Sequence, residues 1–140
     1  MSTWPAYARG ALLFLGALLL ASGCRQGRRC ATCGMKVDPA SAWVSYVTIG
    51  EKEEAFDTPS CAISAWKKAG ARGGNARFRE YYSQEMKPAK ELRFVRGSDV
   101  IGPMGPDLVP VGADTASRFA RDHNGAPAQT ADQIVGGQAP

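Results

Sequence analysis

The sequence predicts a small α+β protein whose folded part consists of two ββαβ-type halves. Residues 43–49, WVSYVTI, alternate apolar and polar side chains and are rich in β-branched residues, as strands are. Thr58-Pro59-Ser60 is typical of a helix start, because threonine caps helices and proline fits the first helical position. The segments FDTPSCAISAWKKAGA and VGADTASRFARDHNGA share one layout with little identity, which indicates a weak twofold repeat.

The first half is expected to span residues 30–88. Its apolar patterns and turn residues predict a series of elements in this order: a strand at 43–49, a turn at 50–53, a strand from 54, a helix from 59 to Gly70, a loop at 73–75 and a strand at 78–82. The helix carries Ile63 and Trp66 on one face. This half is too small to be very stable alone, so we expect it to pack against the second half.

The second half is expected to span residues 89–135. The same signals predict a strand at 92–95, a loop at 98–107, a strand at 108–111, a helix capped by Asp114 and ended at 124–125, and a possible short strand at 132–135. Pro110 restricts its strand to an edge or a bulge. Residues 126–140 are rich in Ala, Pro, Gly and Gln, which predicts a mostly disordered tail, fully so at 136–140.

The N-terminus has the pattern of an export signal. Residues 11–21, ALLFLGALLLA, follow Arg9 and are too short to span a bilayer comfortably. Leu20-Ala21-Ser22-Gly23-Cys24 resembles the lipobox of bacterial lipoproteins, although leucine is commoner than Ala21 at its position. The sequence therefore predicts removal of residues 1–23, lipidation of Cys24 and a tether at 24–29. An ordinary signal-peptidase site and a retained membrane helix are the alternatives.

Composition excludes several function classes. The net charge is +4, but the basic residues are spread out and no basic stripe is interleaved with aromatics, so nucleic acid is not expected as a partner. Arg25, Arg28 and Arg29 beside the predicted anchor favour an anionic membrane surface. A single histidine, no G-x-S-x-G serine and no phosphate-binding glycine pattern argue against an enzyme.

The cysteine count points to metal binding. Of four cysteines, a lipidated Cys24 leaves Cys30, Cys33 and Cys61, an odd number that cannot all pair within one chain. An exported protein meets oxidising conditions, where a thiol that stays free usually has a function. The sequence therefore predicts that these thiols bind a metal ion.

The segment Cys30-Ala31-Thr32-Cys33-Gly34-Met35 places two sulfurs three residues apart, with Gly34 to relieve crowding in a tight turn. Met35 adds a neutral thioether. Taken alone, the C-x-x-C pattern is compatible with half a zinc site, a redox dithiol, a soft-metal site or a structural disulfide.

Four further residues have a chemical and a structural interpretation each. Cys61 falls in the first helical turn, where the helix dipole should lower its pKa, or it is a small buried hydrophobe. Met104 stands in a stiff Gly-Pro loop, as a displayed thioether or as a core plug. For His123 a structural role is favoured over that of a metal ligand. Asp57 is expected to cap the helix or to form a turn.

Together these segments resemble the NosL family, the accessory lipoproteins of nitrous oxide reductase assembly. The resemblance runs from the lipobox to about residue 135 and rests on several motifs: C-x-x-C-G-M at 30–35, F-D-x-x-x-C at 56–61, G-S-D-V-x-G-P-M-G at 97–105, and the segment 114–125 with Phe119 and His123. It implies two ββαβ halves, Cu(I) binding in the periplasm and copper delivery to the reductase. By position it implies five ligands: Cys30, Cys33, Met35, Cys61 and Met104.

One departure bears on the ligands that the resemblance implies. Many members of the family have a histidine directly after P-M-G, whereas this chain has Pro106-Asp107. The coordination shell is therefore expected to be weaker or to consist entirely of sulfur, and the client enzyme is left open.

Thiolate and thioether sulfur together favour Cu(I). The sequence thus predicts a periplasmic, lipid-anchored Cu(I)-binding protein, not an enzyme, that serves a client cuproenzyme such as nitrous oxide reductase. One alternative is a structural Zn²⁺ site made of three cysteines and His123, whose loss would unfold the chain. The other is a thiol–disulfide oxidoreductase using Cys30 and Cys33.

Overall fold

The computed structural model describes residues 27–70 and 75–137. The predicted export signal, Cys24, Arg25, the glycines at 73–74 and the last three residues lie outside the described residues. The described helices and strands follow in chain order: β1 (Ser45–Ile49), β2 (Lys52–Phe56), α2 (Pro59–Lys68), β3 (Ala76–Arg79), β4 (Met86–Pro88), the 3-10 helix η2 (Ala89–Glu91), β5 (Leu92–Val95), β6 (Ile101–Gly102), β7 (Gly105–Pro106), β8 (Val109–Gly112), α3 (Ala116–Asp122) and α4 (Ala131–Gly136). The predicted α+β class is confirmed.

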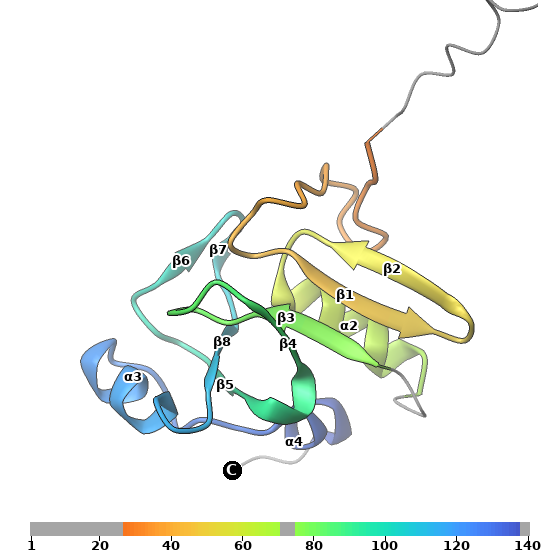
Figure 1. Ribbon diagram of the computed structural model, residues 1–140. Coiled ribbons are helices and arrows are strands. Elements are labelled where there is room, and N and C mark those ends of the chain that lie inside the picture. The colour runs from red at the N-terminus through yellow and green to blue at the C-terminus, as the bar shows by residue number, and fades with distance from the viewer. Residues whose placement is uncertain (1–26, 71–74, 138–140) are drawn as a thin grey trace, which may run out of the picture.

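The main sheet has the strand order β2-β1-β3-β4, with antiparallel neighbours (Figure 1). In its centre, Ser45 of β1 lies opposite Phe56 of β2 on one side and Phe78 of β3 on the other. Figure 1 shows α2 across one face of this sheet, where it contacts β1 and β2. The third strand starts two residues earlier than predicted, and Tyr81 and Tyr82 lie in the turn that follows it.

The start of α2 agrees with the sequence prediction. The side chain of Thr58 accepts a hydrogen bond from the backbone N–H of Cys61 at 3.3 Å, and Pro59 is the first helical residue. This cap satisfies one of the N–H groups that the first helical turn leaves without an intrahelical acceptor. The helix ends at Lys68, and Gly70 follows in the left-handed region. The local sequence thus fixes the position of Cys61 in the first turn.

The second half differs from the predicted ββαβ order. The strands expected at 92–95 and 108–111 are confirmed as β5 and β8, which pair with each other. The expected loop at 98–107 contains the short hairpin β6–β7. Asp114 does not cap α3: Thr115 occupies the cap position and makes no side-chain cap bond. The chain completes a backbone turn from Gly112 to Thr115 first, so the helix begins later than the sequence suggests.

Residues near the C-terminus are helical, which corrects two expectations. The short strand expected at 132–135 is part of helix α4. The tail predicted to be mostly disordered is helical from Ala131 to Gly136. Thr130 and Gln133 form a capping box, in which each side chain accepts from the other's backbone N–H. This local signal favours a helix, and α4 then packs on α2 and β5. The second half therefore lacks a closing strand.

The main hydrophobic core takes side chains from both predicted halves. Phe78 of β3 and Phe94 of β5 meet edge to face, with ring centroids 4.9 Å apart, in the same cluster as Cys30 and Cys61. A smaller cluster around Phe119 lies between β5, β8 and α3. The halves share one core, as the size argument predicts. The boundary at residues 88 and 89 stays a prediction.

Glu80 links the two halves through a buried carboxylate. Its Oε2 accepts from the backbone N–H of Ser83 at 2.6 Å, and its Oε1 accepts from the N–H of Gly112 at 3.2 Å. Burial opposes ionisation, but the hydrogen bonds from Ser83, Tyr82 and Gly112 outweigh it, so the pKa of Glu80 lies below its usual value. The charged form is thus the one that the fold stabilises.

We expect Glu80→Gln to lower the free energy of unfolding by about 1–3 kcal/mol at neutral pH, because a charge-assisted hydrogen-bond pair is lost. A depressed pKa stabilises the fold above the ordinary value of 4.5, and this contribution is lost as pH falls through the folded pKa. The difference between wild type and variant should therefore shrink below that pH. Urea unfolding across a pH series measures it, with Glu85→Gln, whose side chain is exposed, as the control. Equal effects of both variants would contradict the assignment.

Candidate metal site

The C-x-x-C-G-M segment forms a closed turn before the first strand. The N–H of Cys30 donates to the carbonyl of Met35, and the N–H of Gly34 donates to the carbonyl of Cys30, both at 2.8 Å. Gly34 has a φ of +78°, a conformation that side chains with a Cβ rarely adopt. The sequence prediction of a tight turn with a glycine is therefore confirmed. The turn directs Cys30 and Cys33 toward the protein interior, with Cys30 buried and Cys33 half-buried.

The turn is held against the start of α2. The hydroxyl of Thr32 donates to the backbone carbonyl of Cys61 at 3.1 Å. The thiol of Cys33 donates to Oδ1 of Asp57, also at 3.1 Å, and Asp57 stands between β2 and α2. The N-terminal turn thus meets a segment 24 to 29 residues further along the chain, the one that runs from the end of β2 into the first turn of α2.

At this point the ligand atoms of Cys30, Cys33, Cys61 and Asp57 all lie within 4.8 Å of one another. Three of these residues are buried, and Cys33 is the half-buried one. The three thiols are free, so neither the structural disulfide nor any other pairing among them is present. Such a group of thiols and a carboxylate has the donor types and the spacing of a metal site.

Asp57 belongs to this group, although its sequence context predicts only capping or turn formation. Its predicted role was capping, but Thr58 provides the cap, and the Asp57 side chain turns to the cysteines instead. Asp57 is 7% exposed. The signal available in the sequence was the spacing D-x-x-x-C across a strand end and a helix start, which brings a carboxylate and a first-turn thiol to the same end of the helix.

The electrostatics of the cluster couple its thiols to this carboxylate. Burial opposes the charge of Asp57, but the surrounding thiols of Cys30, Cys33 and Cys61 outweigh that effect and lower its pKa. Burial raises the pKa of the Cys33 thiol, and its hydrogen bond to Asp57 adds to the rise. The raised pKa favours the protonated form of the Cys33 thiol when no metal is bound, so a cation that binds this sulfur must displace a proton.

The pKa of Cys61 moves opposite to the expected direction. The helix start was predicted to lower it, but burial raises it well above its usual value, and the charges of Cys30 and Asp57 add to the rise. The bond to Thr58 works in the other direction and is the smaller effect. Catalytic thiols in oxidoreductases have lowered pKa values. The raised pKa of Cys33, one of the two cysteines of the predicted dithiol, thus argues against the thiol–disulfide oxidoreductase alternative.

The two candidate methionine ligands are exposed. Met35 is 50% exposed, and Met104, in the turn of the β6–β7 hairpin, is 57% exposed. The core-plug interpretation of Met104 is therefore wrong. The structure joins the hairpin segment to α2 through Asp107, whose Oδ1 accepts from the N–H groups of Ser60 and Leu108 at 2.9 and 2.7 Å.

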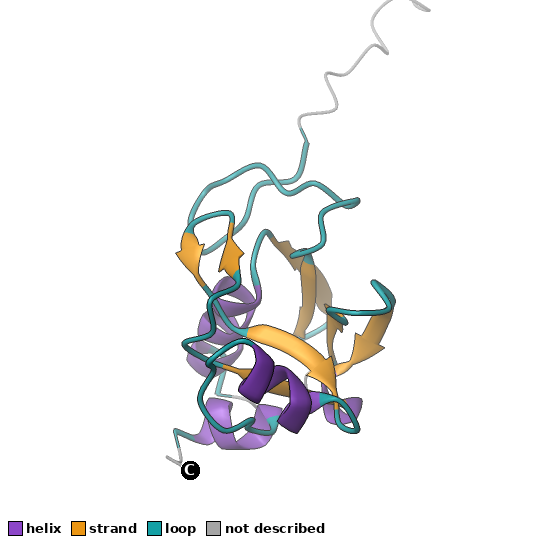
Figure 2. Cartoon of the chain, turned by 90° about the vertical axis from the view of Figure 1, so that its left-hand side faces the viewer, coloured by secondary structure: helices purple, strands orange, loops and turns teal. Residues whose placement is uncertain are grey.

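Both views place this hairpin at the same end of the molecule as the first described residues, from 27 onward (Figures 1 and 2). Pro106 and Asp107 follow the P-M-G motif, after which many NosL proteins have a histidine. In this chain the Asp107 side chain caps the start of α2. The predicted roles of Met35 and Met104 as ligands stay predictions.

His123 is not a member of the cysteine cluster. Its Nδ1 lies 2.8 Å from Oδ1 of Asp99, and its ring packs on Phe119 with centroids 4.4 Å apart. This agrees with the structural role that the sequence analysis favoured. The fourth polar group beside the three cysteines is therefore Asp57, which removes the basis of the zinc alternative with His123.

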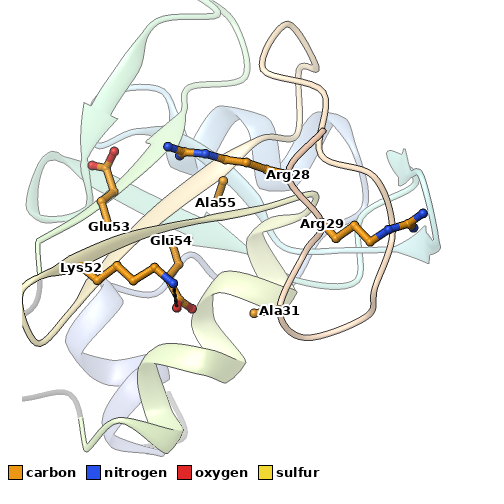
Figure 3. Close-up of a pocket in the computed structure, with 7 residues that line it drawn as sticks. All are labelled: Arg28, Arg29, Ala31, Lys52, Glu53, Glu54 and Ala55. Carbon is orange, nitrogen blue, oxygen red and sulfur yellow. Dashed lines mark ion pairs between the residues drawn. The ribbon is translucent and has the colours of Figure 1, made fainter. Parts of the chain in front are cut away.

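A surface pocket flanks the cysteine turn on its outer side (Figure 3). Ala31, between the two cysteines, lines it together with residues of β2. Arg28 extends over Ala55, whereas Arg29 points away, and Lys52 pairs with Glu54 at 3.4 Å. Because positively and negatively charged side chains both line the pocket, its charge favours neither an anionic nor a cationic ligand.

The fold and the cluster define a small α+β protein with a candidate soft-metal site in which thiols predominate. The NosL family model matches residues 23–135, so the chain belongs to the NosL family. NosL proteins are copper-binding accessory proteins and not enzymes, which confirms the prediction that this chain is no enzyme. Comparison with curated proteins gives no match. Among the described residues, no helix is long and apolar enough to cross a membrane.

Proposed function

We propose that this protein binds Cu(I) through cysteine sulfur and delivers it to a client cuproenzyme, with nitrous oxide reductase as the client. The observation that carries the proposal is the convergence of three free thiols in a member of a copper-binding family. Thiolates are soft donors that suit Cu(I), and three of them are enough to enclose a monovalent ion. Membership of the NosL family supports the reductase as the recipient.

The partial burial of the site is better suited to a protein that carries and releases a metal ion than to a permanent structural metal centre. Cys30 and Cys61 are buried, but Cys33 is half-buried, so one sulfur is accessible to an incoming or departing ion. Ligand exchange with a partner can begin at that sulfur. Two hydrophobic clusters hold the fold together, and one of them contains no cysteine. The metal-free chain should therefore stay folded, unlike a protein built around structural zinc.

Met35 and Met104 are proposed as further sulfur donors or as a gate during transfer. Both thioethers are exposed on short turns, where a partner can reach them. The Asp107 bonds fix the hairpin segment that carries Met104 to the helix turn that carries Cys61. A thioether binds Cu(I) without a proton to displace, which makes it suited to transient contact.

The proposed place of action is the periplasm, with the protein held at a membrane through lipid on Cys24. The support is the lipobox-like sequence and the family membership. The short tether to residue 29 would keep the metal site near the membrane surface. Arg28 and Arg29 are exposed there and favour an anionic surface.

Competition with a Cu(I) chelator tests the proposal. The chain from residue 24 onward, reduced and without oxygen, should withdraw Cu(I) from the chelator and pass it to metal-free nitrous oxide reductase. Circular dichroism of the metal-free form should show a folded protein. Failure to compete for Cu(I), or unfolding when metal is removed, would refute the carrier function.

We expect Met104→Leu to lower Cu(I) affinity with little change in apo stability. The swap is close in volume, and at an exposed position it should cost well under ~1.5 kcal/mol. Thermal melting of the apo form and Cu(I) competition on the same variant measure both effects. Ile101→Leu, on the neighbouring strand β6, is the matched control for hairpin packing. Wild-type Cu(I) affinity in Met104→Leu would remove Met104 from the site.

A further inference from the structure

Asp57 is the least explained polar group in the cluster. One carboxylate oxygen, Oδ1, accepts from Cys33, whereas the other, Oδ2, is buried and has no hydrogen-bond partner. Burying a charged oxygen without a partner is costly, and native proteins rarely leave one so. A cation between the carboxylate and the thiols would satisfy the unpartnered oxygen.

The geometry accommodates a four-coordinate ion. In tetrahedral zinc sites the Zn–S distance is about 2.3 Å, so neighbouring sulfurs stand roughly 3.8 Å apart. The four ligand atoms of the cluster already lie within 4.8 Å of one another, and Cys33 Sγ is 3.1 Å from Asp57 Oδ1. Contraction by about 1 Å would close the shell without moving either of the two segments far.

Zn(II) and Cu(I) differ in charge and in the donor atoms that they prefer, and both differences affect how this cluster binds them. A divalent ion neutralises twice as much of the buried negative charge of three thiolates and a carboxylate as Cu(I) does, and uncompensated buried charge is costly. Carboxylate oxygen is also a good ligand for Zn(II) and a poor one for Cu(I). Asp57 therefore adds to the binding of the divalent ion and adds little to the binding of Cu(I).

We propose that the same cluster binds Zn(II) with Asp57 as its fourth ligand, so that Zn(II) and Cu(I) compete for Cys30, Cys33 and Cys61. This inference rests on the proposed function, which supplies the Cu(I) side of the competition. Asp57 is then the residue that sets the selectivity of the site. The proposed zinc site differs from the one that the sequence suggested, because its fourth ligand is the carboxylate of Asp57 and not His123.

Asp57→Asn tests the proposal, since asparagine keeps the shape and removes the charge. Zn(II) affinity, measured by competition with a Zn(II) chelator, should fall at least about tenfold, while Cu(I) affinity stays at the wild-type value. Co(II), used as a probe, should give intense tetrahedral absorption bands in wild type and weak or shifted bands in the variant. Asp99→Asn, which removes an exposed carboxylate paired with His123, is the matched control and should change neither affinity.

A second variant separates ligation from folding. Asp57→Cys should restore Zn(II) binding, because thiolate is also a zinc ligand, whereas a purely structural carboxylate would not be replaced by a thiol. Wild-type protein that binds Cu(I) but not Zn(II) would overturn this inference and leave the proposed function intact. Equal loss of both metals in Asp57→Asn, or no loss of either, would overturn it too. Failure of wild type to bind Cu(I) would refute the proposed function instead.

Discussion

Cys61→Ser should lower Cu(I) affinity by about 100-fold or more, because loss of an outer-shell partner alone costs roughly 10–100-fold and here the ligand itself is removed. Cys61 is the one donor that comes from α2, and its thiol faces both Cys30 and Asp57. Without it the remaining thiols, Cys30 and Cys33, both belong to the N-terminal turn. The ion would lose its link to the helix.

Stability should change much less than affinity in this variant. Serine is close to cysteine in size, but a buried hydroxyl without good partners costs about 1–3 kcal/mol. That is less than the roughly 5–15 kcal/mol that holds a typical domain folded. Chelator competition and thermal melting of the apo form measure the two effects. Ser60→Ala, at the exposed neighbouring position, is the control, since it keeps the N–H that binds Asp107. Near wild-type Cu(I) affinity in Cys61→Ser would exclude Cys61 as a ligand.

Phe94→Ala should destabilise the protein by about 3–5 kcal/mol, the range for removing a fully buried phenylalanine. The Phe94 side chain is completely buried and meets Phe78 edge to face, so it joins β5 to the main sheet. The backbone of Phe94 is also paired with Gln129, which leads into α4. A cavity here would loosen the contact between the two predicted halves.

Loss of Phe94 should also disturb the metal site from a distance, because Phe94 belongs to the same core cluster as Cys30 and Cys61. Urea unfolding measures the stability, and Cu(I) competition on the folded fraction measures the second effect. Ile101→Ala serves as the control: its side chain is 60% exposed, so the change should stay within about 0.5 kcal/mol. A Phe94→Ala protein as stable as Ile101→Ala would show that the halves do not depend on this contact.

Features that depend on neighbouring residues were predictable from the sequence. Thr58 and Pro59 start α2 because a hydroxyl cap and a fixed proline φ act within one turn. The C-x-x-C-G turn closes because Gly34 adopts a positive φ that its neighbours require. The alternation at 43–49 predicted β1, since one face of the strand is buried. The family motifs likewise identified the three cysteines that converge.

Features that depend on packing were not predictable in the same way. The strand expected at 132–135 is helical, because a capping box and contacts with α2 outweigh a short apolar run. The thiol pKa of Cys61 is raised, because burial and nearby charges depend on what surrounds the helix start. A helix dipole alone gives the opposite direction.

By itself, the sequence determined the α+β class, the turn that presents Cys30 and Cys33, and the helix start that carries Cys61. The tertiary structure alone decided that Asp57 completes the cluster, that His123 pairs with Asp99 elsewhere, and that Met104 is exposed. Turns and caps are set by residues a few positions apart. A metal site joins a turn, a strand end and a helix start, so its membership is fixed only when the shared core brings those segments together.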